Sequence, residues 1–277
     1  MRKDDYQRDG FVVVRNCIPP AVLDQLGEDL AKTFHLRAKA LGLNLPAVST
    51  HADLTDLLCG LFECDRASYI AAAKLTQHLA SVHRFGISPE LMDVVEELGL
   101  ALPAISTRPV IHYMADRLKI PGGYQKTPNH QDWRSVQGSL DALTIWIPLF
   151  DVGRGDYPLE IIPRSHTRGI LPSVEDVPNY RICDEDLGSG KFEALSMKQG
   201  DAVFFSAFLI HRTGIVGGDL VRISFSFRYN NVAEPHFIDR NYPNPYLYRP
   251  DMSVLTPDFP GPEQMREIFP DFAEIES

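Results

Sequence analysis

The chain has 277 residues, of which 44% are hydrophobic and 23% are charged, the ordinary balance of a globular protein with a sizeable apolar interior. The formal net charge is −10 at pH 7, which argues against a nucleic-acid-binding protein, because such a protein carries a basic face to neutralise phosphates. A small anionic ligand stays compatible with this charge, since a few local arginines can bind an anion inside an acidic protein.

The N-terminal residues, Met1 to Asp5, are polar and lack the apolar core of a signal peptide. No window of the sequence approaches eighteen uninterrupted apolar residues, so we expect no membrane span. The cysteines form no CxxC pair, which is typical of a reduced intracellular protein; they are Cys17, Cys59, Cys64 and Cys183. These features predict a cytoplasmic protein.

Helical patterns dominate the first hundred residues. Pro19-Pro20 opens a stretch with apolar residues every three or four positions, which closes near Gly42. Residues 66–84, rich in alanine, predict a second helix. Ser88-Pro89-Glu90 is typical of a helix start, and Gly99 is the expected stop.

After residue 100 the period of the apolar pattern changes to two, which is typical of β-strands. Residues 139–149 alternate, with Thr144 and Trp146 on the polar side. Residues 220–230 alternate more clearly, and their polar side carries Arg222, Ser224, Ser226, Arg228 and Asn230. A further short strand follows Gly200-Asp201, and Gly217-Gly218-Asp219 suggests a hairpin turn.

These patterns predict a mainly β fold with flanking helices. We expect a jelly-roll, cupin-like core whose N-terminal helices pack on one sheet. No repeat or low-complexity linker divides the chain, so residues 1–277 are interpreted as one domain. It would comprise a helical part (about 1–100), a β core (about 101–232) and a tail (233–277) without assigned regular structure.

Asn129-His130-Gln131-Asp132 places two metal-ligand side chains at positions i and i+2. On an extended chain such residues point to the same side, so one metal could be held by both. Two histidines and one carboxylate on one face of iron(II) leave positions open for a co-substrate and oxygen. A His-x-Asp pair alone is a weak signal, and a surface turn is the simpler alternative.

His211 and Arg222 supply the second half of the pattern. If the intervening turn is centred near Val216 and Gly217, an antiparallel register sets His211 opposite Arg222, and the two side chains share a face. A buried guanidinium there would need an anion, which a carboxylate satisfies in bidentate fashion. The alternative is an exposed sheet face, on which polar residues need no special role.

Several stretches, taken together and in order, resemble the phytanoyl-CoA dioxygenase family of 2-oxoglutarate oxygenases. They cover about residues 108–230: His130-Gln-Asp-Trp133, Trp146-Ile-Pro-Leu-Phe-Asp151, Pro158 to His166, Gly200 to Phe205, and His211 to Arg222. Asp9 to Val13 also resembles the opening of the family.

The resemblance implies a double-stranded β-helix, with iron(II) bound by His130, Asp132 and His211. It further implies that Arg222 binds the far carboxylate of 2-oxoglutarate and that Thr213 donates a hydrogen bond to it. Trp146 corresponds to a position lining the same pocket. The implied reaction uses O₂, releases succinate and CO₂, and oxidises a prime substrate. Because related halogenases lack the carboxylate at the position of Asp132, its presence implies hydroxylation or a related oxidation rather than halogenation.

Two stretches depart from the common family pattern. Residues 133–139 belong to a subset of the family rather than to the acyl-CoA type, and Pro-Arg-Ser-His at 163–166 replaces the commoner Pro-Gly-Ser-His. The leading hypothesis is a small or medium-sized polar substrate, and the acidic net charge favours this over a CoA thioester. The residues that could contact this substrate, each with a structural alternative, are His112, Trp133, Arg134 and Glu160.

Two other functions stay open from the sequence. One is a jelly-roll binding protein that kept the fold and lost catalysis, although retention of all three ligands together with Arg222 argues against it. The other is a metal-dependent, cupin-like enzyme that does not use 2-oxoglutarate, for which Arg222 would be dispensable.

Overall fold

The computed structural model describes residues 2–44, 47–119, 126–176 and 179–243, all of which lie in one compact unit, Met1–Tyr246. The helices before residue 100 are α1 (Arg2–Asp9), α2 (Pro20–Ala40), α3 (His51–Cys64), α4 (Arg66–Thr76), α5 (Ala80–Gly86) and α6 (Pro89–Leu98). Shorter helices follow: η1 (Asp116–Leu118), α7 (Trp133–Val136), η2 (Ser165–Arg168), η3 (Asp184–Leu187) and α8 (Pro235–Asp239).

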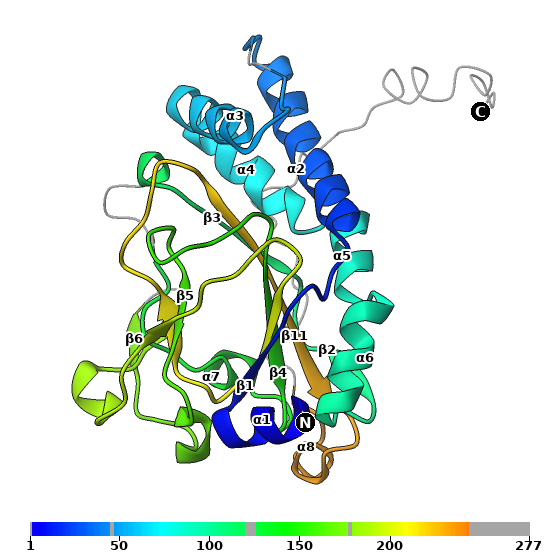
Figure 1. Ribbon diagram of the computed structural model, residues 1–277, viewed down its shortest axis with the longest axis vertical. Coiled ribbons are helices and arrows are strands. Elements are labelled where there is room, and N and C mark those ends of the chain that lie inside the picture. The colour runs from blue at the N-terminus through cyan, green and yellow to red at the C-terminus, as the bar shows by residue number, and fades with distance from the viewer. Residues whose placement is uncertain (1, 45–46, 120–125, 177–178, 244–277) are drawn as a thin grey trace, which may run out of the picture. The chain divides into compact units, whose positions relative to one another are not determined.

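Antiparallel strands form the β core (Figure 1). The larger sheet has the order β1-β9-β4-β11-β2, and β3 also pairs with β11. Its strands are β1 (Phe11–Val14), β2 (Pro103–Ile105), β3 (Val110–Met114), β4 (Leu143–Pro148), β9 (Ala202–Ser206) and β11 (Arg222–Asn231). The smaller sheet, β10-β5-β8, contains β5 (Leu159–Ile161), β8 (Glu193–Ala194) and β10 (His211–Thr213), and β6 (Val174–Asp176) pairs with β7 (Asn179–Arg181).

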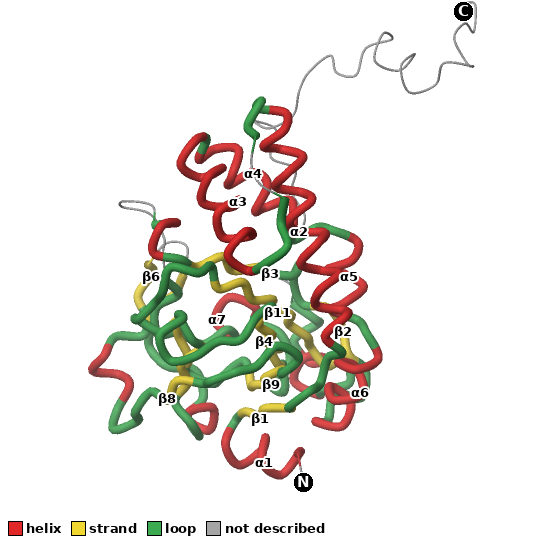
Figure 2. The backbone as a smooth tube through the Cα atoms, turned by 45° about the horizontal axis from the view of Figure 1, so that its top comes forward, coloured by secondary structure: helices red, strands yellow, loops and turns green. Residues whose placement is uncertain are grey.

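The alternation along β11 and β4 divides the larger sheet into two different faces. Phe225 and Phe227 of β11 and Ile145 of β4 join the main apolar core with the N-terminal helices. On the opposite face, Trp146 packs with Leu159 and Ile161 of the smaller sheet. One face is therefore covered by helices and the other by the second sheet, an arrangement that Figures 1 and 2 let the reader follow. The predicted β core with helices on one sheet is confirmed.

Several helix boundaries follow directly from the sequence. Proline at the first position opens both α2 and α6, and Gly99, with φ of 123°, ends α6. The prediction of one helix over residues 66–84 is wrong, because α4 ends at Thr76. The Thr76 hydroxyl donates to the carbonyl oxygen of Ala73 and lies 2.7 Å from the Tyr113 hydroxyl.

Several helices were not expected, among them α1, α3, α7 and α8. α3 begins with a capping box in which Thr50 and Asp53 satisfy each other's backbone N–H groups. α8 lies in the tail, for which the sequence predicts no regular structure, and Glu234 caps it by accepting from the backbone N–H groups of His236 and Phe237. The remainder of the predicted tail, from residue 244, lies outside the described residues.

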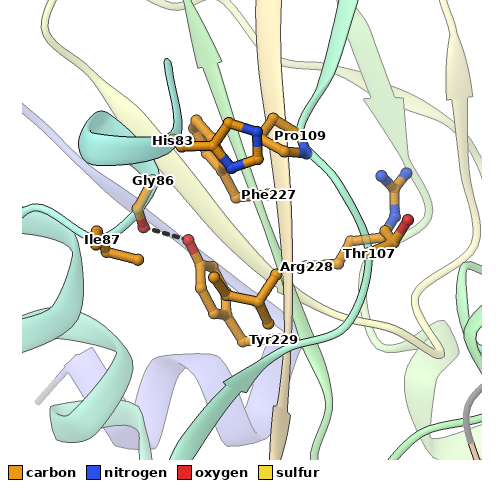
Figure 3. A pocket seen from close by; sticks show the side chains of 9 residues that line it. His83, Gly86, Ile87, Thr107, Pro109, Phe227, Arg228 and Tyr229 are labelled. Atoms are coloured by element: carbon orange, nitrogen blue, oxygen red, sulfur yellow. Dashed lines mark hydrogen bonds between the residues drawn. The ribbon is translucent and has the colours of Figure 1, made fainter. Parts of the chain in front are cut away.

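A shallow hollow lies between α5, β2 and β11 (Figure 3). Its walls include His83, Ile105 and Phe227. Tyr229 crosses it and donates a hydrogen bond to the carbonyl oxygen of Gly86. Because this bond ties the end of α5 to β11, the hollow is explained by the packing of a helix on the sheet.

Phe225→Ala tests the helix-covered face of the sheet. Phe225 is fully buried and lies edge-on to Phe85 of α5, with ring centroids 5.6 Å apart. Its loss should lower the free energy of unfolding by about 3–5 kcal/mol, through lost burial and a residual cavity. Urea denaturation measures this, with Leu36→Ala as the control because Leu36 is 62% exposed. Equal effects of the two substitutions would contradict the described core.

Candidate metal and co-substrate site

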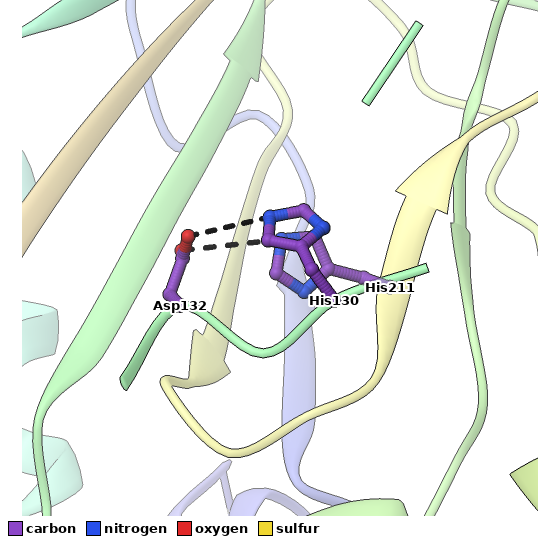
Figure 4. A group of neighbouring side chains, drawn as sticks. All are labelled: His130, Asp132 and His211. Atoms are coloured by element: carbon purple, nitrogen blue, oxygen red, sulfur yellow. Dashed lines mark ion pairs between the residues drawn. The ribbon is translucent and has the colours of Figure 1, made fainter. Parts of the chain in front are cut away.

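His130, Asp132 and His211 bring their ligand atoms together at one place, all within 4.8 Å of one another. His130 Nε2 lies 3.5 Å from Asp132 Oδ1, and His211 Nε2 lies 3.9 Å from Asp132 Oδ2. Figure 4 shows the two imidazoles side by side, both facing the carboxylate. Asp132 and His211 are buried and His130 is only 8% exposed, so a metal held here would be largely removed from water.

Hydrogen bonds to the main chain fix the tautomer of both histidines. His130 Nδ1 lies 2.9 Å from the carbonyl oxygen of Pro128, and His211 Nδ1 lies 2.9 Å from that of Leu209. Because a carbonyl oxygen only accepts, each Nδ1 must carry the hydrogen, and each Nε2 presents its lone pair to the carboxylate side. Burial, followed by the nearby His130, lowers the pKa of His211 to about 3. Neutral Nε2 donors of this kind suit a divalent metal.

The carboxylate of Asp132 is held by two further side chains. Arg228 donates from Nη2 to Oδ1 at 3.0 Å, and the Thr144 hydroxyl donates to Oδ2 at 2.7 Å. Burial alone would raise the pKa of Asp132, but Arg228 and the two histidines hold that pKa well below its usual range. The group is therefore an anion inside the protein, as a metal-binding carboxylate must be.

Local structure brings the three groups together in an unexpected way. His130 and His211 form an antiparallel bridge, whereas Asp132 has helical φ and ψ values and precedes α7. The extended backbone expected for both residues of the His-x-Asp pair is therefore present at His130 but not at Asp132. Although aspartate often caps a helix, the Asp132 side chain makes no capping bond to α7, so its carboxylate is available to the site.

The expected hairpin register between His211 and Arg222 is wrong. His211 is opposite Ile161 in the smaller sheet, and Arg222 is opposite Met114 in the larger sheet. The residues between β10 and β11 therefore cross from one sheet to the other and do not form a tight turn at Gly217. The hairpin prediction failed because turn residues mark a change of direction without specifying the partner strand.

Arg222 is a buried cation with unused hydrogen-bonding capacity. It is only 5% exposed, and burial lowers its pKa to about 9. Its Nη1 donates to the Ser224 hydroxyl, and its guanidinium carbon lies 5.6 Å from the centre of the Trp146 ring. Its buried Nε has no hydrogen-bond partner in the part of the chain that the structure describes. A buried guanidinium in this condition fits an anionic ligand.

The other predicted site residues lie in different surroundings. Thr213 is buried, two residues after His211 on β10. His112 is opposite Ser224, and burial, followed by the charge of Arg222, lowers its pKa to about 3. His112 keeps part of its surface accessible, so protein does not enclose it completely.

Trp133, Arg134 and Glu160 already have protein partners. Trp133 stacks on Phe208 with ring centroids 5.2 Å apart, and Arg134 donates to the carbonyl oxygen of Leu171, although its buried Nε has no partner among the described residues. Glu160 forms an ion pair of 2.6 Å with Arg212. It alternates along β5 with Leu159 and Ile161, which pack between the sheets, so its side chain points away from them.

Arg228 and Thr144 contact the site through Asp132 and were not predicted as site residues from the sequence. The alternation along β11 had already placed Arg228 on the same face as Arg222, and that along β4 had placed Thr144 on the same face as Trp146. The signal was therefore present in the sequence. The missing information was that Arg228 and Thr144 are opposite each other in the ladder.

A family model described as phytanoyl-CoA dioxygenase matches residues 6–222, most of the chain. The chain belongs to the phytanoyl-CoA dioxygenase family. It is therefore a dioxygenase of the non-haem iron and 2-oxoglutarate-dependent class, as the resemblance implied. The peroxisomal phytanoyl-CoA dioxygenases of Bos taurus and Homo sapiens are each 25% identical over 256 residues, covering 84% of this chain and 68% of theirs.

Solved structures show the same fold at low sequence identity. The epimerase SnoN, in complex with Fe³⁺, α-ketoglutarate and nogalamycin RO, is 18% identical with a TM-score of 0.55, covering 83% of this chain and 82% of its own. EctD from S. alaskensis, with 2-oxoglutarate and 5-hydroxyectoine, is 17% identical with a TM-score of 0.55, covering 84% and 76%. These similarities confirm the cupin-like, jelly-roll fold predicted for this family member. Among the described residues, no helix is both long and apolar enough to span a membrane.

The pH dependence of stability tests the description of His112. A histidine with a folded pKa of about 3 and an unfolded pKa of about 6.5 stabilises the fold above pH 6.5, and this contribution is lost as the pH falls from 6.5 towards 3. His112→Gln should therefore reduce the pH dependence in that window, by an amount that rises to about 1.4 kcal/mol per pH unit near pH 5. Urea denaturation of the metal-free protein between about pH 7 and pH 5 measures it. An unchanged dependence would show that His112 titrates equally in both states.

Proposed function

We propose that this enzyme binds iron(II) through His130 Nε2, His211 Nε2 and the carboxylate of Asp132. One observation carries the assignment: both histidines are fixed with Nε2 free, and the three ligand groups lie within 4.8 Å. Two imidazoles and one carboxylate suit non-haem iron(II) with open coordination positions. When bound there, iron(II) and 2-oxoglutarate would supply the chemistry that activates O₂ for oxidation of a substrate, with release of succinate and CO₂.

Arg222, assisted by Thr213 and Trp146, is proposed to bind 2-oxoglutarate. The support is the buried guanidinium whose Nε has no described partner and whose charge burial disfavours. A carboxylate would accept from the guanidinium and compensate its charge. Trp146 borders the same guanidinium and restricts the space around it. In this proposal the protein orients the co-substrate and keeps water away from the reacting groups.

The prime substrate is proposed to be a small or medium-sized polar metabolite, which the enzyme hydroxylates. His112 supports a polar substrate, because a neutral imidazole both donates and accepts hydrogen bonds. Trp133 and Arg134 follow Asp132 directly on α7 and are the other proposed contacts. We leave out Glu160, whose carboxylate is paired with Arg212. The presence of Asp132, rather than a residue without a carboxylate, favours hydroxylation over halogenation.

A reducing compartment such as the cytoplasm is also proposed. Cys17, Cys59, Cys64 and Cys183 are all free thiols in the structure, as is usual for proteins kept reduced. The net charge of −10 supports a small molecule rather than a nucleic acid as the binding partner.

His130→Ala and Asp132→Ala test the ligand assignment. Each should abolish succinate formation from 2-oxoglutarate in the presence of iron(II), ascorbate and O₂, because loss of a ligand destroys the iron site. Arg15→Ala is a matched control, since Arg15 pairs at 2.6 Å with a different buried aspartate, Asp201. The measurement is succinate release across a metabolite library that includes an acyl-CoA. Wild-type rates in either ligand variant would refute the assignment.

Arg222→Ala tests the co-substrate assignment. Removing one partner of a buried charge pair costs about 2–5 kcal/mol, so 2-oxoglutarate should bind at least about 30-fold more weakly. Calorimetry with 2-oxoglutarate on the manganese-loaded protein measures this loss, while manganese binding itself should persist. Unchanged affinity, with activity retained, would instead indicate a metal-dependent enzyme that does not use 2-oxoglutarate.

A further inference from the structure

The carboxylate of Asp132 has a protein partner on each oxygen besides the two histidines. Arg228 Nη2 lies 3.0 Å from Oδ1, and Thr144 Oγ1 lies 2.7 Å from Oδ2. All three side chains are largely buried, and Asp132 is only 2% exposed. An ionised carboxylate offers about four lone-pair positions, two on each oxygen. The two donors therefore occupy one position on each oxygen and leave the others for the side on which the histidines lie.

We propose that Arg228 and Thr144 are positioning residues, which hold Asp132 in the orientation that the metal requires. This inference rests on the proposed iron site. Neither residue lies among the three ligands, so both act through Asp132. Without them the carboxylate could rotate about its terminal bond, whose torsional preference is broad. A fixed carboxylate presents its remaining lone pairs to the same point as the two Nε2 atoms.

We call Arg228 and Thr144, together with the Asp132 carboxylate that they hold, the clamp. The backbone fixes the relative positions of its two donors. Arg228 of β11 and Thr144 of β4 are opposite each other in one ladder of the larger sheet. Side chains opposite each other on one face lie within contact distance, so the two donors reach the carboxylate from adjacent points on the sheet. Asp132 itself comes from the other side of the site, immediately before α7. The clamp thus joins the His-x-Asp segment to the larger sheet.

The charge of Arg228 adds a second reason for this assignment. A carboxylate 2% exposed loses most of its hydration, and an arginine partner offsets that loss. Arg222, on the same strand and the same face six residues earlier, carries no carboxylate partner among the described residues. The two arginines of β11 therefore have separate roles. Arg228 binds the carboxylate of Asp132, whereas Arg222 is available to bind the carboxylate of a ligand.

Manganese(II) binding to the metal-free protein tests the proposal without relying on activity. Arg228→Ala should weaken Mn²⁺ affinity by about 10- to 100-fold, the usual effect of losing a group that orients a metal ligand. Arg228→Lys should lose less, because it keeps a charged donor. At saturating Mn²⁺ both variants should bind 2-oxoglutarate nearly as the wild type does, in contrast to Arg222→Ala.

Thr144 provides the second variant pair, which is needed if Arg228→Ala fails to fold. Thr144→Val replaces the hydroxyl with a methyl group of similar shape, and Thr144→Ser restores the donor. Mn²⁺ affinity should fall by about tenfold in Thr144→Val and return towards the wild-type value in Thr144→Ser. Arg15→Ala is again the control, since it removes arginine from Asp201 instead.

The outcomes separate this proposal from the iron site itself. If the wild-type protein binds no Mn²⁺ at this site, the proposed iron site fails. If the wild type binds Mn²⁺ and the variants of Arg228 and Thr144 bind it equally well, the clamp is overturned while the iron site stands. If only the clamp variants lose affinity and Arg15→Ala does not, the positioning role is supported.

Discussion

The site depends on keeping one carboxylate ionised beside two neutral imidazoles in the interior of the protein. Burial disfavours the charge of Asp132, and the protein compensates with Arg228, Thr144 and the two histidines. Main-chain carbonyl groups in turn orient His130 and His211. Each proposed ligand therefore has a protein partner: a main-chain carbonyl group for each histidine, and Arg228 and Thr144 for Asp132. The remaining lone pairs of the two Nε2 atoms and the carboxylate converge on one point. A metal ion at this point would accept the lone pairs that converge there.

Apolar and polar residues alternate along β11, so that one strand contributes both to the apolar core and to the candidate site. The apolar residues of β11, such as Phe225 and Phe227, pack against the N-terminal helices. Its polar residues, including Arg222 and Arg228, face the interior between the sheets. Because both faces of the larger sheet are covered, the arginines are largely removed from solvent, which supports the roles proposed for them. An exposed sheet face, the alternative that the sequence left open, would have left them hydrated and without a specific role.

Short-range patterns in the sequence predicted much of this fold. Prolines and a glycine gave the limits of α2 and α6, and period-two alternation gave β4 and β11. Pairing between distant segments could not be obtained in the same way, since nothing local to His211 specifies that β10 joins β5 rather than β11. The role of Arg228 was missed for the same reason, because it depends on which residue of β4 lies opposite. The proposed metal ligands were predicted chiefly from the family resemblance, which carries such long-range information. The capping box at Thr50, by contrast, is a local signal that could have revealed α3.

The most direct measurement of the central claim is a crystal structure of the protein grown with manganese(II) and 2-oxoglutarate, with anomalous scattering recorded to locate the metal. We expect one anomalous peak coordinated by Nε2 of His130, Nε2 of His211 and an oxygen of Asp132, with the far carboxylate of 2-oxoglutarate on Arg222. A metal bound elsewhere, or a co-substrate that leaves Arg222 without an anion, would contradict this expectation.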